Sequence, residues 1–226
     1  MPMLLAIDTS TVQTGLACYD ANGILGECSW FSGRDHTTQL LPQLHLLLQH
    51  LGRTPNDITA VGVALGPGSW SGLRVGLSIA KGLALACQAR LLGVGTLDVI
   101  AYQHFQSGIP IYPLIRLGRE RFATATYADT APWQRTSAYR NLTLSELVAD
   151  IDGRAYFCGD IDSEVQASLQ KGLGQDALFP GIATNLRRSG YLAELAWKRL
   201  QCNESDDCIT LEPIYLGQSV KKSPLS

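Results

Sequence analysis

The chain contains few charged residues and lacks the long apolar runs that mark membrane proteins. Lys, Arg, Asp and Glu make up 17% of its 226 residues, below the roughly 25% of an average soluble protein. Its 18 basic and 20 acidic residues leave a net charge of -2, so no overall field attracts nucleic acid or anionic lipid. No stretch approaches the ~18 uninterrupted apolar residues of a membrane span. With 46% hydrophobic residues, the chain can bury a core, which excludes disorder throughout.

The chain also lacks cysteine pairs of the C-x-x-C type and a recognisable leader sequence. Several of its six cysteines lie inside apolar runs such as LALAC and YFC, as reduced core cysteines of cytosolic proteins do. The N-terminus, MPMLLAIDTS, has no basic segment and reaches an acidic residue early, so it does not resemble a signal peptide. We therefore expect a cytoplasmic protein with no membrane partner.

The first half of the chain alternates between strand and helix patterns. Short apolar runs bounded by turn-forming residues predict an antiparallel meander of three strands, at 4–9, 14–19 and 24–31. Leucines at helical spacing predict a helix over 39–51 that begins near Pro42, because proline fits only the first turn of a helix.

A strand–helix–strand–helix series follows. Its predicted bounds are 60–65, 72–87, 91–94 and 97–104, with Thr96 as the cap of the last helix. Antiparallel strands extended by parallel ones through helical crossovers predict a ribonuclease-H-like α/β sheet.

The second half resembles a weak repeat of the first. Its predicted strands lie at 109–115, 122–127 and 155–158, and its helices open at the capping box of Thr143 and Glu146 and span 163–171 and 183–202. The chain is therefore expected to be an α/β protein of mixed sheets with flanking helices. Its first lobe is expected at 1–108 and a smaller, degenerate second lobe at 109–226.

Two turns of the first lobe could carry chemistry. Asp8, Thr9 and Ser10 follow the first strand, where a carboxylate could hold Mg²⁺ and the hydroxyls could face a phosphate. The same residues could equally cap the strand and hydrogen-bond the turn.

The second turn is the glycine-rich loop GPGSWSG, which joins a buried strand to a helix. Gly66, Gly68 and Ser69 could approach an anion at the helix N-terminus. The loop matches neither the P-loop nor the dinucleotide fingerprint, so a structural turn explains it as well.

The helices expected at 39–51 and 72–87 are more apolar than one lobe requires. Leucines occupy most of the circumference of the first, and small residues recur at every fourth position of the second. One sheet covers only one stripe of a helix, and small residues allow close helix packing. These patterns favour a protein interface over a wholly intramolecular core.

Other chemistry-bearing residues give weaker indications. The histidines show no metal-ligand spacing such as H-E-x-x-H, and no G-x-S-x-G elbow is present, which argues against a metalloprotease or serine hydrolase. Two basic clusters, Arg116 with Arg119 and Arg121, and Arg187 with Arg188, are best explained as solvated surface.

The segments LLAIDTS, HTTQLLPQL, VGVALGPGSWSGLRVGLSIAKGLALA, LLGVGTLDVIA and PIYL together resemble the TsaB family, also called YeaZ. The resemblance is strong over about residues 3–105 and thin beyond. It implies an actin-like, ribonuclease-H-related fold of two lobes.

The resemblance also implies a non-catalytic role in threonylcarbamoyladenosine biosynthesis. The family's partner, TsaD, transfers the threonylcarbamoyl group to the adenosine 3′ of the anticodon in tRNAs that read codons beginning with A. The ATPase TsaE joins the complex, and tRNA contacts this subunit only through the complex. No cofactor is required by the chain itself, although ATP or ADP with Mg²⁺ could lie at the partner interface.

The family's contact surface corresponds here to the helices at 39–51 and 72–87. The residues expected to contact TsaD are Leu44, Leu48, Leu73, Gly76, Leu77, Ala80 and Leu83. No catalytic or metal-binding residues are expected.

The second lobe departs from the family pattern. Many members have Asp-Ala-Arg after its first strand, whereas this chain has Arg116-Leu117-Gly118. Neither a second phosphate loop nor a glycine pair for adenine is recognisable, which argues against independent catalysis. The alternatives are an actin-fold ATPase or small-molecule kinase that uses Asp8 and the loop at 66–72, and a homodimeric structural protein that pairs through the same helices.

Overall fold

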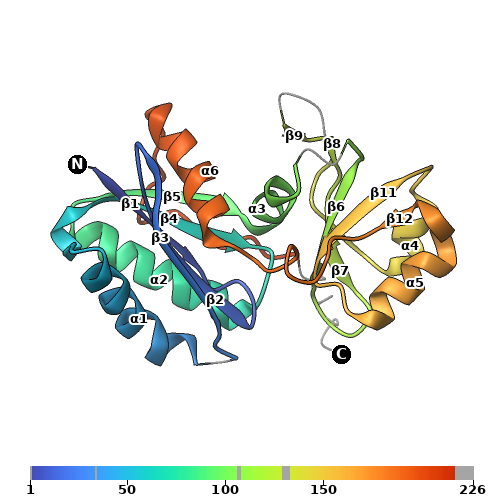
Figure 1. Cartoon of the computed structure of the whole chain (residues 1–226), viewed down its shortest axis with the longest axis horizontal. Helices are drawn as coiled ribbons and strands as arrows, with labels where there is room; N and C mark the ends of the chain where they lie inside the picture. The colour runs from blue at the N-terminus through green and yellow to red at the C-terminus, as the bar shows by residue number, and fades with distance from the viewer. Residues whose placement is uncertain (1, 34, 106–107, 129–132, 217–226) are drawn as a thin grey trace, which may run out of the picture.

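The computed structural model describes residues 2–33, 35–105, 108–128 and 133–216, which form two lobes side by side (Figure 1). Each lobe is built on a mixed sheet flanked by helices, and the chain passes from the first lobe to the second and later returns to the first. The expected α/β class with an actin-like arrangement of two lobes is confirmed by this architecture.

The first sheet has the strand order β3-β2-β1-β4-β5. Its strands are β1 (Met3–Asp8), β2 (Gln13–Asp20), β3 (Gly23–Phe31), β4 (Ile58–Gly66) and β5 (Arg90–Gly95). The first three pair antiparallel, and β4 and β5 add parallel to β1. The predicted ribonuclease-H-like sheet is therefore correct. The central strand β1 is buried along its whole length, as a strand covered on both faces must be.

Helices α1 (His36–His50) and α2 (Trp70–Ala86) cover one face of this sheet, and the short 3-10 turn η1 (Pro55–Asp57) leads from α1 into β4. The prediction that α1 begins near Pro42 is wrong, because the helix starts at His36 and contains the proline. Pro42 lies on the exposed side, so the apolar row Leu40, Leu44 and Leu48 still packs on the sheet and offsets the lost backbone hydrogen bond.

Helix α3 (Thr96–Gln103) follows β5 and joins the two lobes. Its N-cap is Gly95, so the predicted capping role of Thr96 is wrong. The Thr96 hydroxyl instead accepts a hydrogen bond from the backbone N–H of Gly66 at 3.0 Å.

The second sheet has the order β10-β7-β6-β11-β12; β8 also pairs with β6, and β9 pairs with β8. Its strands are β6 (Ile111–Arg116), β7 (Phe122–Thr124), β8 (Tyr127–Ala128), β9 (Gln134–Arg135), β10 (Arg140–Leu142), β11 (Ala155–Gly159) and β12 (Ala177–Leu178). The expected strand at 122–127 is divided, because β7 pairs with β10 while β8 pairs with β9.

Helices α4 (Leu144–Ala149) and α5 (Ser163–Leu173) pack on this sheet, and the 3-10 turn η2 (Gly174–Asp176) leads into β12. The capping box predicted at Thr143 and Glu146 is present.

The last helix, α6 (Ser189–Gln201), returns to the first lobe and covers the other face of its sheet. It begins later than the predicted 183, because the residues before it form the crossing segment between the lobes. Its buried residues Leu192, Ala193 and Ala196 share a core with Leu4 and Ala6 of β1. A helix within the expected second lobe, 109–226, therefore contributes to the core of the first.

Candidate functional site

The turn after β1 carries the first predicted site residues, Asp8, Thr9 and Ser10. One carboxylate oxygen of Asp8, Oδ1, accepts hydrogen bonds from the Ser10 backbone N–H at 2.9 Å and from the Ser10 hydroxyl at 2.6 Å. All three residues are buried, with exposed fractions of 7%, 2% and 0%. In this structure the Asp8 carboxylate therefore organises its own turn.

The glycine-rich loop packs directly against this turn. The Ser69 backbone N–H donates to the Ser10 carbonyl at 2.7 Å, and the Thr9 hydroxyl donates to the Gly72 carbonyl at 2.7 Å. A Cβ atom at Gly68 or Gly72 would overlap a backbone carbonyl oxygen of the Asp8 turn. The two turns predicted to bind phosphate therefore do meet. The glycines at 68 and 72 allow the backbones of the two segments to touch each other.

The ends of the loop are also occupied by groups of the chain. Ser69 caps α2, because its hydroxyl accepts from the Gly72 backbone N–H at 3.3 Å. Gly66 has a φ of 102°, and a Cβ there would lie 2.8 Å from the carbonyl oxygen of Ile214. The segment around Ile214 thus covers the start of the loop. There the Ile214 N–H donates to the Leu65 carbonyl at 2.7 Å.

Arg187 enters the same site from the second crossing between the lobes. Its Nη1 donates to the Ser10 hydroxyl at 2.9 Å, and its Nη2 lies 3.5 Å from Asp160 Oδ1. The interpretation of Arg187 as solvated surface is wrong, because its side chain is only 12% exposed. Sequence reasoning missed this residue since its partner Ser10 lies 177 positions away.

The space enclosed between Asp8 and Arg187 does not fit a nucleotide phosphate with Mg²⁺. Its volume is about 10 Å³, which is room for no more than one water molecule. A fixed guanidinium in this space would also repel a divalent cation. In addition, the described residues contain no group of three or more His, Cys, Asp or Glu placed to hold a metal ion.

The expected interface residues lie mainly in the core, which corrects their assignment as direct contacts. Leu44, Leu48, Leu73, Leu77 and Ala80 are at most 6% exposed, and Leu83 is half-buried. They face the sheet of their own lobe because a helix turns its most regular apolar stripe toward the nearest apolar surface.

Gly76 is also buried, and a Cβ there would overlap the Thr9 hydroxyl. The close approach predicted at this glycine is therefore made to the Asp8 turn and not to a second helix.

The opposite sides of α1 and α2 are exposed, and we call them the α1–α2 outer face. This face consists of Leu41, His45, Trp70, Arg74, Ser78, Gly82 and Leu85. Its large apolar side chains are 49% exposed at Leu41, 59% at Trp70 and 69% at Leu85. A Cβ at Gly82 would meet no side chain or other segment within 4 Å, so the surface of α2 is open there.

Comparison with known proteins identifies the family. A model of the family "TsaD: tRNA N6-adenosine threonylcarbamoyltransferase" matches residues 30–190. The Bacillus subtilis tRNA threonylcarbamoyladenosine biosynthesis protein TsaB is 27% identical over 219 residues, which cover 94% of this chain and 93% of that protein. The chain belongs to the TsaB (YeaZ) family. It is thereby a member of a family of tRNA threonylcarbamoyladenosine biosynthesis proteins.

Likeness to the TsaB family is uneven along the chain. The Escherichia coli TsaB is 37% identical over 98 residues, which cover 43% of this chain and 42% of that protein. A solved Pseudomonas aeruginosa protein described as similar to YeaZ covers 96% of this chain and all of its own, with a TM-score of 0.81 at 21% identity. The fold thus extends over both lobes.

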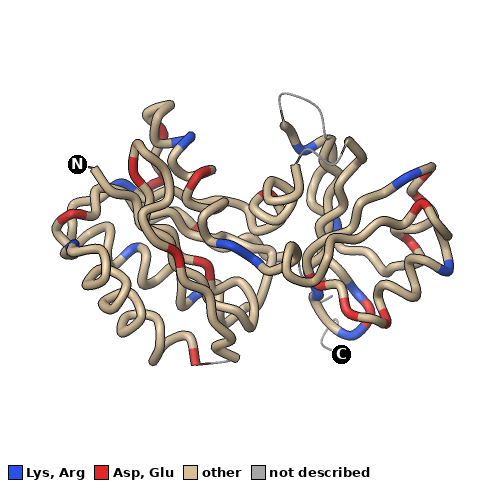
Figure 2. Tube along the Cα trace, in the orientation of Figure 1, with Lys and Arg blue, Asp and Glu red and all other residues tan. Residues whose placement is uncertain are grey.

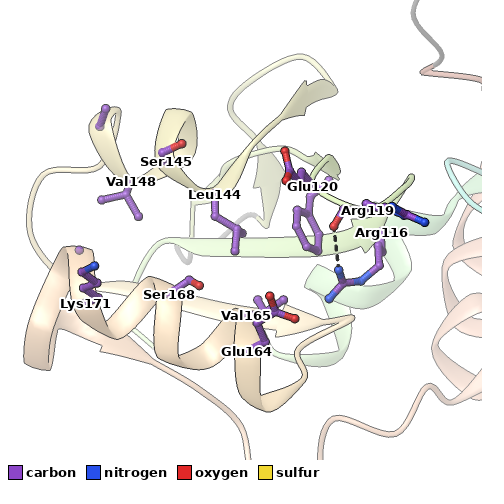
Figure 3. A pocket seen from close by; sticks show the side chains of 13 residues that line it. Arg116, Arg119, Glu120, Leu144, Ser145, Val148, Glu164, Val165, Ser168 and Lys171 are labelled. Atoms are coloured by element: carbon purple, nitrogen blue, oxygen red, sulfur yellow. Dashed lines mark hydrogen bonds between the residues drawn. The ribbon is translucent and has the colours of Figure 1, made fainter.

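The second lobe contains a groove of about 630 Å³ between α4 and α5 (Figure 3). Its apolar lining includes the buried side chains of Phe122 from β7 and Val165 from α5. Arg116 lies at one end of the groove. It is the first residue of the segment Arg116-Leu117-Gly118, which departs from the TsaB pattern. Its guanidinium donates to the Arg119 carbonyl and binds Asp162 at 2.6 Å. The departure is therefore accommodated by a local ion pair at the rim of the groove.

Proposed function

We propose that this chain is a non-catalytic subunit that binds a TsaD-type transferase and supports threonylcarbamoyl transfer to the adenosine 3′ of the anticodon. The α1–α2 outer face carries the proposal. It presents the exposed apolar side chains of Leu41, Trp70 and Leu85 together with the small exposed residues Ser78 and Gly82. Small residues flanked by large apolar ones suit close packing against helices of a partner.

The closed Asp8 turn supports the non-catalytic part of this proposal. The residues that an actin-fold ATPase or kinase would use for phosphate and Mg²⁺ are hydrogen-bonded to one another and to Arg187. Such an enzyme needs an accessible anion site at the helix N-terminus. The alternative of an independent ATPase therefore loses its main structural basis.

The nucleotide expected in the complex is better accommodated beside the outer face. A cavity of about 530 Å³ lies between the lobes and is lined by Pro67, Trp70, Arg121 and the segment around Tyr215. An aromatic ring and an arginine could bind a base and a phosphate. We place ATP or ADP there only in the presence of the partner.

The remaining partners follow from the same proposal. Among the described residues, basic and acidic positions are interspersed along the trace of both lobes (Figure 2), a distribution unlike the clustered basic residues that bind a phosphate backbone. We therefore assign tRNA binding to the complex, in which TsaE also takes part. The structure contains no helix with the length and hydropathy of a membrane span among the residues it describes.

The test is a bulky substitution on the outer face that the chain itself tolerates. Gly82→Leu introduces a side chain into open space and replaces the poorest non-proline helix former with a good one. We expect the variant to keep the wild-type melting temperature, to bind TsaD at least tenfold more weakly by calorimetry, and to support less tRNA modification with TsaD, TsaE and the threonylcarbamoyl-adenylate donor.

Ala167→Leu provides the matched control, because it places the same side chain at an exposed position of α5 in the second lobe. It should leave TsaD binding and modification unchanged. Wild-type binding by Gly82→Leu would show that α2 is not the contact. Light scattering of the chain alone tests the alternative of a homodimer that pairs through this face. In that case the wild-type chain would be a dimer and Gly82→Leu a monomer.

A further inference from the structure

The second crossing segment carries Arg187 to the Asp8 turn by a fixed route. The Asn185 side-chain amide both donates to the Gly159 carbonyl and accepts from the Gly159 N–H, each at 2.8 Å. Gln103 Nε2 donates to the carbonyls of Thr184 at 2.6 Å and Leu186 at 2.8 Å. The segment that precedes Arg187 is thus held by the end of α3 and by β11.

One end of the Arg187 guanidinium reaches the first lobe. Nη1 donates to the Ser10 hydroxyl at 2.9 Å and lies 3.4 Å from the Thr11 hydroxyl. The Ser10 hydroxyl donates in turn to Asp8 Oδ1 at 2.6 Å. A single hydroxyl therefore connects the cation to the buried Asp8 carboxylate.

The other end of the guanidinium faces the second lobe. Nη2 lies 3.5 Å from Asp160 Oδ1 but makes no hydrogen bond among the described residues, although the atom is buried. Asp160 follows β11, and its other oxygen accepts from the Arg116 backbone N–H at 2.9 Å. Nη2 is shielded from water and the Asp160 side chain is 32% exposed, so solvent screens their attraction only in part.

We propose that Arg187 is a built-in cation that fills the phosphate position beside the Asp8 turn and ties the two lobes together without a nucleotide. A bound nucleotide with its metal could bridge the turns of two lobes in such a fold, whereas here one side chain reaches Ser10 in the first lobe and Asp160 in the second. A planar guanidinium suits this role because its donors point in fixed directions toward two partners. The lobes therefore stay closed in the free chain.

Arg187→Ala tests the tie, with Arg188→Ala as the matched control. Arg188 is the neighbouring arginine, is 50% exposed and pairs with Glu27 within the first lobe. Removal of a buried charged hydrogen-bond donor should lower the melting temperature of the chain by roughly 5 °C, against about 1–2 °C for Arg188, whose own side chain is half exposed. Small-angle scattering should show a larger radius of gyration for Arg187→Ala only.

Two further measurements decide whether the guanidinium itself is responsible. Methylguanidinium at millimolar concentration should restore part of the lost stability of Arg187→Ala and none of that of Arg188→Ala. In a double-mutant cycle with Asp160→Ala, the two losses should be non-additive, because both remove the same contact. Equal melting temperatures and equal radii for the two arginine variants, or additive losses in the cycle, would overturn the proposal.

If Arg187→Ala does not fold, Arg187→Lys replaces it. Lysine keeps the charge but has one compact ammonium group, which can approach Ser10 or Asp160 and not both. We expect a melting temperature below wild type and a larger radius of gyration. A wild-type melting temperature and radius for Arg187→Lys would show that a two-ended tie is not required.

Discussion

The two lobes place opposite charges at the same position of their sheets. In each sheet the central strand, β1 or β6, pairs antiparallel with the following strand and parallel with a later one. The first ends in Asp8, which is buried under the glycine-rich loop, and the second ends in Arg116, which is partly exposed and pairs with Asp162. A repeated topology thus constrains where the turns lie and leaves their chemistry free to differ.

The difference between these turns also appears in the glycines that lie in or against them. Gly72 packs against the carbonyl of Thr9, whereas a Cβ at Gly118, in the turn after β6, would meet nothing within 4 Å. The first turn is therefore specified by close contact between two loops, and the second is an ordinary surface turn. Three predictions test this contrast.

The largest effect is expected from Gly72→Ala, at the start of α2 where this helix packs against the first turn. The added methyl group would overlap a backbone carbonyl that cannot move without breaking the hydrogen bond between Ser69 and Ser10. Overpacking of this kind should lower the free energy of unfolding by about 3 kcal/mol. Urea denaturation measures the change. Gly118→Ala is the control in the second turn and should cost less than about 0.5 kcal/mol; equal losses would remove the contrast.

A smaller effect on the free energy of unfolding is expected from acidification. It depends on two histidines, His36 and His104, whose surroundings differ. His36 in the first lobe contacts the hydroxyls of Thr14 and Ser32, and burial lowers its pKa while Asp8 and Asp35 raise it. His104 at the end of α3 packs on the ring of Tyr156 in the second lobe. Burial alone lowers the pKa of His104 to about 4.

Because the folded-state pKa of His104 is below the unfolded value of about 6.5, its stabilising contribution is present above pH 6.5 and is lost as the pH falls toward 4. The free energy of unfolding should fall by about 2 kcal/mol over this range and level off below it. Urea titrations at several pH values measure the slope. His104→Phe keeps a ring of similar size and should remove most of it; an unchanged slope would assign the acid sensitivity to His36 or to the carboxylates.

The smallest effect is expected from Arg116→Met in the second lobe. Arg116 and Asp162 are 33% and 55% exposed, and solvent screens such a pair. The methionine keeps an apolar contact with the Phe122 ring, over which the guanidinium now lies at 4.9 Å. The free energy of unfolding should fall by less than about 1 kcal/mol, and added salt should reduce the difference. A loss as large as that of Gly72→Ala would mean that the second turn is as tightly specified as the first.

The sequence by itself determined the elements of the first lobe, its sheet order and the family. These follow from short-range patterns, since alternating and helical periodicities are set by residues a few positions apart. The Asp8 turn follows β1, and the glycine-rich loop follows β4. Because these two strands are parallel neighbours, the meeting of the two turns at one edge of the sheet was predictable.

Only the tertiary structure decided which sides of the helices are free and what fills the Asp8 turn. An apolar stripe such as Leu44 and Leu48 has the same sequence pattern whether its own sheet or a partner covers it. The return of α6 to the first lobe and the contact between Arg187 and Ser10 join segments far apart in the chain. No local pattern encodes such contacts, because they depend on how the two lobes pack once each has formed.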